Sequence, residues 1–427
     1  MNKTFSVPRG TSDILPDAAP LWEELETKAR KICKSYGYRE IRTPVYEDTN
    51  LFSRSLGQTS DVVNKQLLEL ASAKEDEGLA LRPEGTASVV RSYLENSFDK
   101  KEQLSKFFYI GPMFRGERPQ KGRLRQFHQI GVEAIGIDGA SPFHDAEILA
   151  LAMHLLQEFN VQGPKLKINS LGSKEDKEHI SIWLRTEFTK HKNELCEDCQ
   201  NRFERNVFRV LDCKNEVCRK VVNAVIGKDK ALPLSDNSLK YFGYVQKALK
   251  DSGINFEISP HLVRGLDYYT HTVFEITAEG LGSQDAVGAG GRYDRLLDDL
   301  GGNEKTEYGA IGFALGIERI LLATEKKQAE PQAIDAFVIE TQPEYQHRAF
   351  QLLSDLRKNS ISATASFSGG SMKSLMSRAN KASARFALII GDQEYKDKTV
   401  SVKNMSTGQQ ETVQLSEVVE VIKKKLN

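Results

Sequence analysis

Apolar residues recur at two different periods along the chain, and each change of period marks a new element. Between residues 21 and 36 they return every three or four positions, which predicts a helix that ends at Gly37. Alternating apolar and polar positions then predict short strands, most of them joined by turn residues rather than by helices of crossover length. This pattern favours an α+β fold in which helices flank a mainly antiparallel sheet. The expected strands cover residues 78–81, 106–111, 127–135, 165–170 and 272–277.

A further strand pattern, at residues 38–47, contains Pro44. Proline cannot donate to a ladder of hydrogen bonds, so we expect this strand at a sheet edge or at an interface. A highly charged helical stretch over residues 172–236 interrupts the rhythm and indicates an insertion. Strand and glycine-turn patterns return over residues 256–312, and a helix over 315–326 is expected to close the large domain.

The pattern changes again after a polar stretch, EKKQAEPQA at residues 325–333, which we interpret as a linker. Short apolar segments at 337–340, 362–366 and 386–391 alternate with helical segments. This alternation predicts a small α/β domain with a largely parallel sheet. We therefore expect a large domain over residues 1–325, with the insertion at 172–236, and a small domain over 331–427.

Composition narrows the class of protein. The chain has 39% hydrophobic and 28% charged residues, which is typical of a globular enzyme, and its 59 basic and 59 acidic residues give no net charge. Local clusters, rather than the overall field, must therefore meet any anionic partner. The opening segment MNKTFSVPRGTSDILP lacks the apolar core of a signal peptide. No apolar run approaches the ~20 residues that span a bilayer, so we expect a cytoplasmic protein without a membrane partner.

The densest cluster of charge lies at residues 107–136, where a strand leads into a basic loop and a second strand leaves it. The loop carries a single acid, Glu117. Arginine binds two phosphate oxygens at once, which suits a polyphosphate or an RNA backbone. Phe127 offers a face for stacking a base, and Gln129 and Glu133 alternate onto the same side of the strand. A solvated basic hairpin would show the same pattern. The cations are Arg115, Arg118, Lys121, Arg123 and Arg125.

Three shorter segments carry further candidates, each with a structural alternative. RGLDYYT, at 264–270, places an arginine and a turn at Gly265 before two tyrosines, although a loop arginine can equally cap a carbonyl. RPEGT, at 82–86, offers a carboxylate for an ammonium group, or simply a helix start. The segment 307–323 puts an arginine at a helix start, where Glu318 and its neighbour could also form an exposed pair. The candidates are Glu84, Gly85, Thr86, Arg264, Tyr268, Tyr269 and Arg319.

These segments together resemble the motifs of a known family, the histidyl-tRNA synthetases of class II. Residues 107–136 are similar to motif 2, 307–323 to motif 3, and the strand with Pro44 to motif 1, which forms the dimer interface in that class. RGLDYYT resembles the motif that is specific to histidyl enzymes. The resemblance implies a homodimer that activates L-histidine with ATP and Mg²⁺ and transfers it to the 3′ end of tRNA(His). It also implies a C-terminal anticodon-binding domain.

The resemblance also implies roles for the candidates. Arg115 and Arg264 would contact the α-phosphate and act as the catalytic residues, and Arg319 would bind the γ-phosphate. The glycine-rich segment at 287–297 lacks the spacing of a nucleotide loop and is expected to floor the amino-acid pocket. The remaining ATP residues would be Glu117, Arg123, Arg125 and Phe127. The histidine pocket would comprise Glu84, Gly85, Thr86, Arg115, Gln129, Glu133, Arg264, Tyr268 and Tyr269.

Basic residues near the C-terminus suggest a second contact with RNA. Between residues 373 and 385 there is no acid, and Arg378, Lys381 and Arg385 would share one helical face. A solvated helix face looks similar, but the position after the linker resembles that of the family's anticodon-binding domain. We therefore expect these three residues, with Arg118 and Lys121, to contact tRNA.

Four of the five cysteines lie close together in the insertion. They form a CxxC pair followed by a second pair that is separated by four residues, which is looser than the usual zinc spacing. A structural zinc site at Cys196, Cys199, Cys213 and Cys218 is therefore one interpretation, and we expect it to lie away from the motifs. A disulfide framework is not indicated in a long cytoplasmic chain.

A non-catalytic alternative shares the same resemblance. The regulatory paralogue of ATP phosphoribosyltransferase is built on this catalytic domain and binds histidine-like ligands without acting on RNA, and it normally lacks the anticodon domain. This chain retains Arg115, Arg264 and Arg319 and has a C-terminal domain. The ligase is therefore the favoured interpretation.

Overall fold

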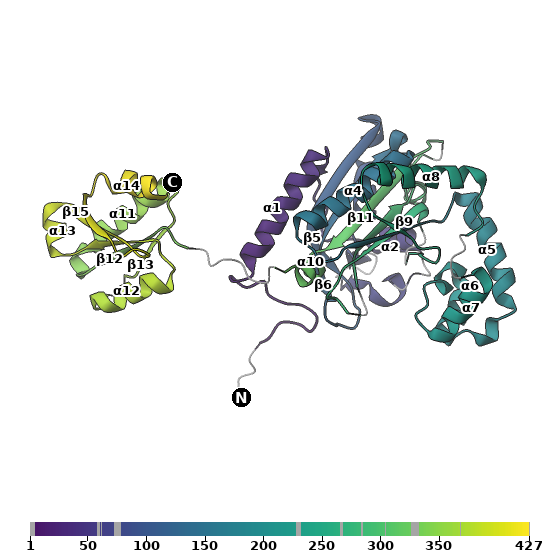
Figure 1. Cartoon of the computed structure of the whole chain (residues 1–427), viewed down its shortest axis with the longest axis horizontal. Helices are drawn as coiled ribbons and strands as arrows, with labels where there is room; N and C mark the ends of the chain where they lie inside the picture. Colours follow the sequence, from purple (N-terminus) through teal and green to yellow (C-terminus); the bar gives the residue numbers. More distant parts are fainter. Residues whose placement is uncertain are drawn as a thin grey trace. The chain divides into compact units, whose positions relative to one another are not determined.

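The structure is a computed structural model. It describes residues 5–57, 60, 62–71, 78–227, 232–264, 268–282, 285–303, 305–325, 333–367 and 369–426. The chain divides into two compact units, residues 1–327 and 328–427, which are drawn in Figure 1. The stretch interpreted as a linker lies mostly outside the described residues. Within the described ranges, the helices are all too short or too polar to cross a membrane.

An eight-stranded sheet forms the centre of the first unit. Its order is β1–β5–β6–β11–β10–β9–β7–β8, and all neighbours pair antiparallel except β1 with β5 and β7 with β8. The expectation of a mainly antiparallel sheet is therefore confirmed. The strands are β1 (Arg39–Glu40), β5 (Leu104–Phe114), β6 (Gln126–Gly136), β7 (Lys165–Ser170), β8 (Glu257–Ile258), β9 (Thr270–Thr277), β10 (Ala286–Arg292) and β11 (Gly309–Gly316).

The strand expected over residues 38–47 is broken before Pro44, so that expectation was wrong. The first piece, β1, ends at Glu40, and the second, β2 (Tyr46–Asp48), belongs to a separate three-stranded sheet of order β2–β4–β3. The carbonyl oxygens of Thr43 and Pro44 accept from Arg82 Nη1, at 2.9 and 3.2 Å, instead of joining a ladder. Both pieces are edge strands, as a proline requires. The other strands of the small sheet are β3 (Leu68–Leu70) and β4 (Leu79–Leu81).

The eight-stranded sheet separates two hydrophobic cores. Helices α1 (Ala19–Ser35), α4 (Pro142–Glu158) and α8 (Asp236–Asp251) pack on one face and bury residues such as Leu25, Leu149 and Val245. Residues 130, 132 and 134 of β6 point into this core, so residues 127, 129 and 133 face the other side of the sheet. The alternation of β6 therefore decides which of its side chains can reach a ligand.

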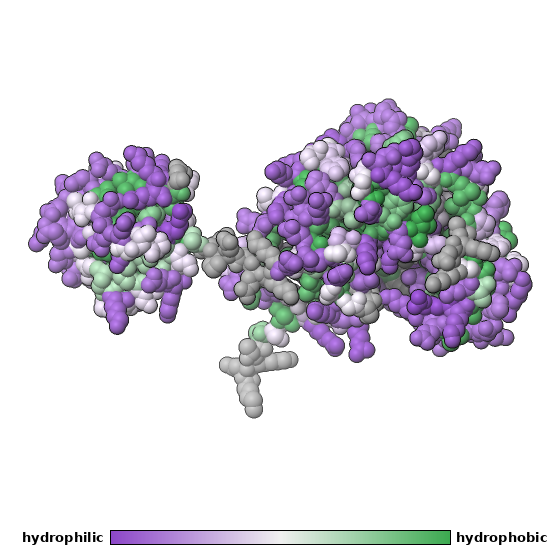
Figure 2. All heavy atoms as spheres, viewed as in Figure 1, coloured by the Kyte–Doolittle hydropathy of each residue, from purple (hydrophilic) through white to green (hydrophobic). Residues whose placement is uncertain are grey.

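Hydrophilic residues cover most of the visible face of each unit, with hydrophobic residues in smaller patches between them (Figure 2). Scattered exposed hydrophobic residues are normal. Two of them, Val45 and Tyr46, lie directly after Pro44 and are 41% and 49% exposed. The segment that resembles motif 1 thus offers apolar surface at a sheet edge.

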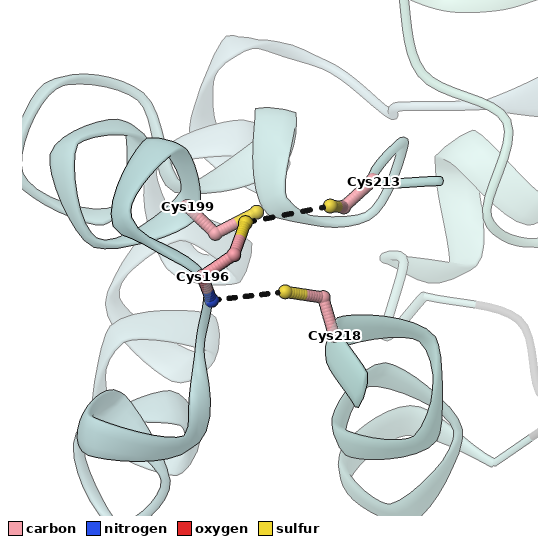
Figure 3. A group of neighbouring side chains, drawn as sticks. All are labelled: Cys196, Cys199, Cys213 and Cys218. Carbon is pink, nitrogen blue, oxygen red and sulfur yellow. Dashed lines mark hydrogen bonds between the residues drawn. The ribbon is translucent and has the colours of Figure 1, made fainter. Parts of the chain in front are cut away.

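The insertion is helical. Helices α5 (Lys174–Thr189), α6 (Glu197–Arg205) and α7 (Glu216–Ile226) follow one another, and the four cysteines gather where α6 and α7 begin (Figure 3). Asp176 closes the base of the insertion, because its carboxylate accepts hydrogen bonds from the amides of Ser173 and Ser235, at 3.1 and 3.0 Å, and from the Ser238 hydroxyl, at 2.5 Å.

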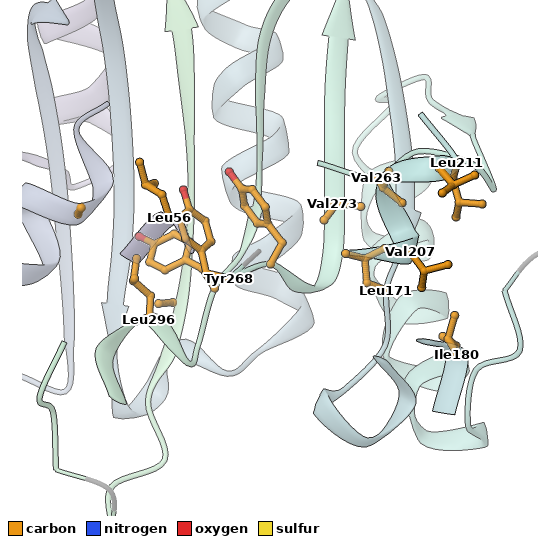
Figure 4. Close-up of a cluster of buried hydrophobic side chains, with 14 of the residues drawn as sticks. Leu56, Leu171, Ile180, Val207, Leu211, Val263, Tyr268, Val273 and Leu296 are labelled. Carbon is orange, nitrogen blue, oxygen red and sulfur yellow. The ribbon is translucent and has the colours of Figure 1, made fainter. Parts of the chain in front are cut away.

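The insertion shares the second core with the catalytic sheet. Ile180, Val207 and Leu211 of the insertion belong to the same cluster as Val273 of β9 and Tyr268 (Figure 4). The remaining helices of the first unit are α2 (Thr49–Leu56), α3 (Thr86–Glu95), α9 (Leu296–Asp299) and α10 (Ile317–Ala323). Helix α10 begins later than expected, because Leu315 and Gly316 still pair with β6.

The second unit contains a five-stranded sheet of order β13–β12–β14–β15–β16. The first three strands are parallel, but β14 with β15 and β15 with β16 pair antiparallel. The expectation of a largely parallel sheet was therefore only half right, because a C-terminal hairpin extends it. The strands are β12 (Ala336–Glu340), β13 (Ala363–Ala365), β14 (Phe386–Ile390), β15 (Thr399–Asn404) and β16 (Gln410–Gln414), and the helices are α11 (Gln346–Lys358), α12 (Met372–Lys381), α13 (Asp392–Asp397) and α14 (Val418–Leu426).

Candidate active site

A cavity of about 930 Å³ lies on the face of the large sheet opposite the α1–α4–α8 helices. A volume of this order suits a ligand-binding pocket. Strands β6, β10 and β11 contribute to its wall, together with the start of α3, the tyrosine segment before β9 and part of the insertion. The expected site residues that line it are Glu84, Thr86, Arg115, Glu117, Arg123, Phe127, Gln129, Arg264, Tyr268, Tyr269 and Arg319.

Arg115 is held at the end of β5 by backbone and ring contacts. Its amide donates to Arg125 O at 2.8 Å, and its Nε donates to Pro83 O at 2.9 Å. Its guanidinium lies 5.1 Å from the centre of the Phe127 ring. Burial lowers the pKa of Arg115 from its ordinary value. These contacts fix a cation and an aromatic face side by side at the rim of β6.

Arg319 connects three parts of the cavity wall. Its Nε donates to Ala286 O at 2.5 Å and its Nη1 to Gly122 O at 3.2 Å, so the start of α10 is tied to β10 and to the basic loop. Its neighbour Glu318 lies 2.9 Å from the amide nitrogen of His128 and 2.9 Å from its Nδ1. The alternative of an exposed charged pair is therefore wrong, because both side chains bind other segments.

The basic loop between β5 and β6 is anchored at its base. The amide of Gly116 donates to Gln66 O at 2.6 Å, and the amide of Arg125 donates to Gly10 O at 2.7 Å. Arg123 Nη1 lies 3.4 Å from Glu117 Oε2 inside the cavity wall. The other three cations, Arg118, Lys121 and Arg125, are exposed and do not line the cavity.

A buried carboxylate lies beneath the cavity. Glu133 is fully buried and accepts hydrogen bonds from the hydroxyls of Tyr293 at 2.5 Å, Thr86 at 2.7 Å and Tyr109 at 3.4 Å. Burial raises the pKa of Glu133 to about 8, and the hydroxyl donors oppose that rise. Three donors on one carboxyl group fix both of its oxygens in position.

The RPEGT segment forms the start of helix α3 and also lines part of the cavity. Glu84 accepts hydrogen bonds from the amides of Thr86 at 2.7 Å and Ala87 at 2.9 Å, which caps α3. The structural alternative for Glu84 is therefore confirmed, although Glu84 also lines the cavity. Gly85 has no room for a side chain, because a Cβ there would lie 2.2 Å from Tyr109 Cζ.

Aromatic rings form one wall of the pocket. The rings of Tyr268 and Tyr269 lie 4.6 Å apart, and the ring of Tyr293 lies 5.7 Å from that of Tyr268. Next to them, Arg264 Nη1 lies 2.7 Å from Glu275 Oε2 on β9. Three other residues of the RGLDYYT motif, Gly265, Leu266 and Asp267, are outside the described residues.

Tyr293 and Glu275 were not identified from the sequence. Tyr293 lies within the glycine-rich segment at 287–297, and both Tyr293 and Gly288 line the cavity. Its contact is with Glu133, 160 positions away in the sequence. Gln129 was identified, and it shows why β6 suits a polar ligand: its Oε1 is buried and has no hydrogen-bond partner among the described residues. A buried acceptor of this kind is available to a ligand donor.

The cysteine group does not lie away from the motifs, so that expectation was wrong. Cys196 and Cys213 line the same cavity as Arg115 and Arg264, together with neighbouring residues of the insertion. The insertion folds back because its apolar residues share the second core with the sheet. A local sequence pattern does not show which distant segments share a core, so it could not predict this position of the cysteines.

The basic residues of the second unit do not share one helical face. Helix α12 ends at Lys381, and Arg385 follows a turn at Ser383 with a positive φ of 49°. Its amide donates to Ile334 O at 2.8 Å, and its guanidinium lies 3.7 Å from Asp335 Oδ1. Arg378 donates to the Ser366 hydroxyl. Only Arg378 and Lys381 are therefore on the same helix.

An antiparallel sheet that carries arginines from motif 2 and motif 3 above a polar pocket defines a class II aminoacyl-tRNA synthetase. Known proteins agree along nearly the whole chain. A family model described as histidyl-tRNA synthetase matches residues 10–320, and one described as anticodon binding domain matches residues 335–425. The chain belongs to the histidyl-tRNA synthetase family.

Individual relatives cover nearly the whole chain. A histidine–tRNA ligase of Natranaerobius thermophilus is 43% identical over 424 residues, which are 97% of this chain and 98% of the relative. One of Clostridioides difficile is 43% identical over 422 residues, 98% of this chain and 99% of the relative. The crystal structure of apo S. aureus histidyl-tRNA synthetase superposes with a TM-score of 0.80 at 36% identity, covering 98% of this chain and 100% of that one.

Proposed function

We propose that the protein is a histidine–tRNA ligase. It activates L-histidine with ATP, releases pyrophosphate and transfers the histidyl group to the 3′ end of tRNA(His). The observation that carries this proposal is one cavity in which Arg115, Arg264 and Arg319 lie above the buried carboxylate of Glu133. Membership of the family supports the same activity.

Activation joins two anions. A carboxylate oxygen of histidine bonds to the α-phosphorus, and the bond from that phosphorus to the oxygen that bridges it to the β-phosphate breaks. No side-chain nucleophile is required, so the protein contributes mainly position and positive charge. We assign Arg115 to the α-phosphate and the histidine carboxylate, Arg264 to the α-phosphate, and Arg319 to the γ-phosphate.

The contacts of these arginines support the assignment. Arg115 lies against Phe127, on which we propose that adenine stacks, and its Nε is already bound to Pro83 O. Its two terminal nitrogens are therefore the groups that we assign to ligand oxygens. Arg123 and Glu117 complete the ATP site at the cavity wall. Arg125 does not line the cavity, so we assign it, with Arg118 and Lys121, to the acceptor end of tRNA.

Mg²⁺ is used by aminoacyl-tRNA synthetases in general, and the cavity contains donors that fit it. The carboxylates of Glu117 and Asp285 line the cavity, and both interact with the charge of Arg319. Carboxylate oxygens are ligands that Mg²⁺ prefers. When bound, the ion supplies positive charge to the outer phosphates, so we propose these two residues as its protein ligands.

The polar groups below the cavity suit histidine. Imidazole offers one donor and one acceptor, and a wrong amino acid would leave buried partners unpaired, which costs binding energy. We propose that Glu133 and Gln129 supply polar contacts to the imidazole. Tyr268 and Tyr269 would enclose the ring. The α-amino group would lie near Glu84, Gly85 and Thr86. Buried acceptors on both Gln129 and Glu133 support this arrangement.

We also propose that the second unit binds the anticodon region of the tRNA through Arg378, Lys381 and Arg385, although these do not form one helical face. The match to an anticodon-binding model supports this role. For the catalytic unit we propose a homodimer through the Pro44 segment, where Val45 and Tyr46 expose apolar surface at a sheet edge. We assign the protein to the cytoplasm, as for tRNA synthetases generally.

Exchange of labelled pyrophosphate into ATP tests the activity and the role of Arg264 together. With all twenty amino acids supplied singly, we expect exchange with histidine alone and a large loss in Arg264→Ala. Arg30→Ala is the matched control, because Arg30 forms a similar part-exposed ion pair, with Glu26 at 3.0 Å, on α1 and away from the cavity. It should leave exchange unchanged.

Other outcomes are informative. A folded protein that binds histidine but catalyses no exchange would support the regulatory paralogue instead. Exchange that survives in Arg264→Ala would leave the activity in place and remove the role assigned to this arginine.

A further inference from the structure

We propose that Cys196, Cys199, Cys213 and Cys218 bind one structural Zn²⁺, and that this ion fixes residues 209–215 of the insertion as a wall of the active-site cavity. The proposal concerns the insertion and does not depend on which amino acid the enzyme activates. It rests on the placement of the sulfur atoms, on the elements that carry them and on the residues next to them.

The sulfur atoms lie where a tetrahedral metal site would place them. All four lie within 4.8 Å of one another, and the Sγ atoms of Cys196 and Cys213 are 3.9 Å apart (Figure 3). Four thiolates at about 2.3 Å from a central zinc have edges of about 3.8 Å. A disulfide would require about 2.05 Å. The observed separation between this pair therefore matches metal ligation and not a covalent bond.

The backbone around the cysteines also suits thiolates. Cys196 is the residue that precedes α6, and Cys199 lies in its first turn, while Cys218 lies in the first turn of α7. Helix starts favour negative charge. The backbone amide of Cys196 donates to Cys218 Sγ at 3.2 Å. A hydrogen bond of this kind orients a sulfur that binds a metal. A zinc ion would thus join the starts of two helices to the loop that carries Cys213.

The ligand set indicates a structural ion. Cys199 and Cys218 are fully buried, and Cys196 and Cys213 are partly buried. Four cysteine ligands fill the tetrahedron and leave no open position for a water or a substrate, as in structural zinc sites. Binding releases the thiol protons and leaves the metal–thiolate group with a net negative charge. Cations from the insertion, including Arg202 and Lys214, line the adjoining cavity wall.

The site connects directly to the catalytic cavity. Cys196 and Cys213 themselves line it, and so do Arg209, Asp212 and Lys214 of the segment that Cys213 anchors. Residues 211–215 contain no helix or strand. We therefore expect a metal bound to the cysteines to hold this part of the cavity wall in one conformation.

Metal content of the full chain tests the proposal. Purified without an affinity tag and under reducing conditions, the protein should contain about one zinc per chain, as a closed four-cysteine site requires. The content should fall to near zero in Cys199→Ser and Cys218→Ser, and remain in Cys213→His, because histidine is also a zinc ligand. Cys33→Ala is the matched control: Cys33 is the fifth cysteine, it is fully buried on α1, and its variant should retain the metal.

A second measurement covers the case in which the serine variants do not fold. Wild-type protein should release its zinc to a strong chelator after a mercurial blocks the thiols. Trypsin should then cut first within residues 190–227, and the sheet should stay protected. Replacement by Co²⁺ should give the intense visible absorption of a tetrahedral thiolate complex.

The proposal is overturned by wild-type protein that folds with no bound metal, or by a disulfide among the four cysteines. It is also overturned if Cys33→Ala loses zinc to the same extent as Cys199→Ser, because the metal would then be bound elsewhere. Zinc that is present but whose removal leaves residues 190–227 as resistant as before would refute the role in fixing the cavity wall.

Discussion

Replacing Glu133 by glutamine should weaken the use of histidine in a way that depends on pH. Three hydroxyls bind this fully buried carboxyl group, at 2.5, 2.7 and 3.4 Å, and fix its position beneath the cavity. Burial raises its pKa to about 8, and glutamine imitates the protonated form in shape and charge. The variant should therefore differ from wild type only where Glu133 is ionised.

The size of the effect follows from the lost contact. A hydrogen bond to a charged group contributes about 1.5–3 kcal/mol. At about 1.4 kcal/mol per tenfold, kcat/KM for histidine should fall by about 10- to 150-fold above pH 8. Below pH 8 the ratio of the wild-type kcat/KM to the variant kcat/KM should shrink by up to about tenfold per pH unit, because Glu133 is ionised in fewer wild-type molecules. Titration of histidine itself cancels in this ratio.

Pyrophosphate exchange without tRNA, at saturating ATP and varied histidine, measures the ratio from pH 6.5 to 8.5. Glu340→Gln is the matched control, because Glu340 is also a buried acid, 2% exposed, but lies on β12 of the second unit. It should not change exchange. A ratio that does not vary with pH, or one that stays below twofold at pH 8.5 in a folded variant, would refute the role assigned to Glu133.

Four further outcomes are expected. Between pH 4.5, the ordinary pKa of a glutamate, and pH 8, the raised pKa of Glu133, the folded chain keeps a proton on this group and the unfolded chain does not. The free energy of unfolding, measured in urea, should therefore fall as pH rises through this range. The fall should be less steep in Glu133→Gln, which has no carboxyl group to titrate there. Asp145→Ala should cost about 1–3 kcal/mol and lower the Tm, because it removes the buried carboxylate that accepts from Nε and Nη2 of Arg292 and leaves Asp294 as the ion-pair partner of this guanidinium. Arg319→Ala should lower exchange kcat/KM for ATP by about 10²- to 10³-fold with little change in KM for histidine, by steady-state kinetics. Residues 1–327 alone should keep exchange but lose aminoacylation of tRNA, measured with labelled histidine.

The strands that carry the site could be predicted because their signal is local. β6 alternates regularly, and the face that holds Phe127, Gln129 and Glu133 was identified correctly from that alternation. Pro44 indicated an edge, although it breaks the strand rather than bordering it, because the carbonyls of residues 43 and 44 bind Arg82. Periodicity and proline chemistry act within a few residues, so a sequence shows them directly.

Contacts between distant residues could not be predicted in the same way. Tyr293 meets Glu133 only because β10 and β6 both flank β11, and the cysteines meet the cavity only because the insertion shares a core with the sheet. The end of α12 was missed for a different reason. Neither glycine nor proline marks it, and Ser383 adopts the left-handed turn conformation, with a φ of 49°, that glycine usually occupies.

The anchored basic loop has a consequence for the thermodynamics of nucleotide binding. Its base is held by the carbonyls of Gln66 and Gly10, and its tip by Arg319 through Gly122. Ordering a residue from a flexible state costs about 1–2 kcal/mol of conformational entropy. A loop that is already ordered does not incur this cost when ATP arrives, so more of the phosphate contacts contribute to affinity. Loosening any of the three anchors should therefore weaken ATP binding with a more unfavourable entropy, even though none of the anchoring carbonyls needs to touch the nucleotide.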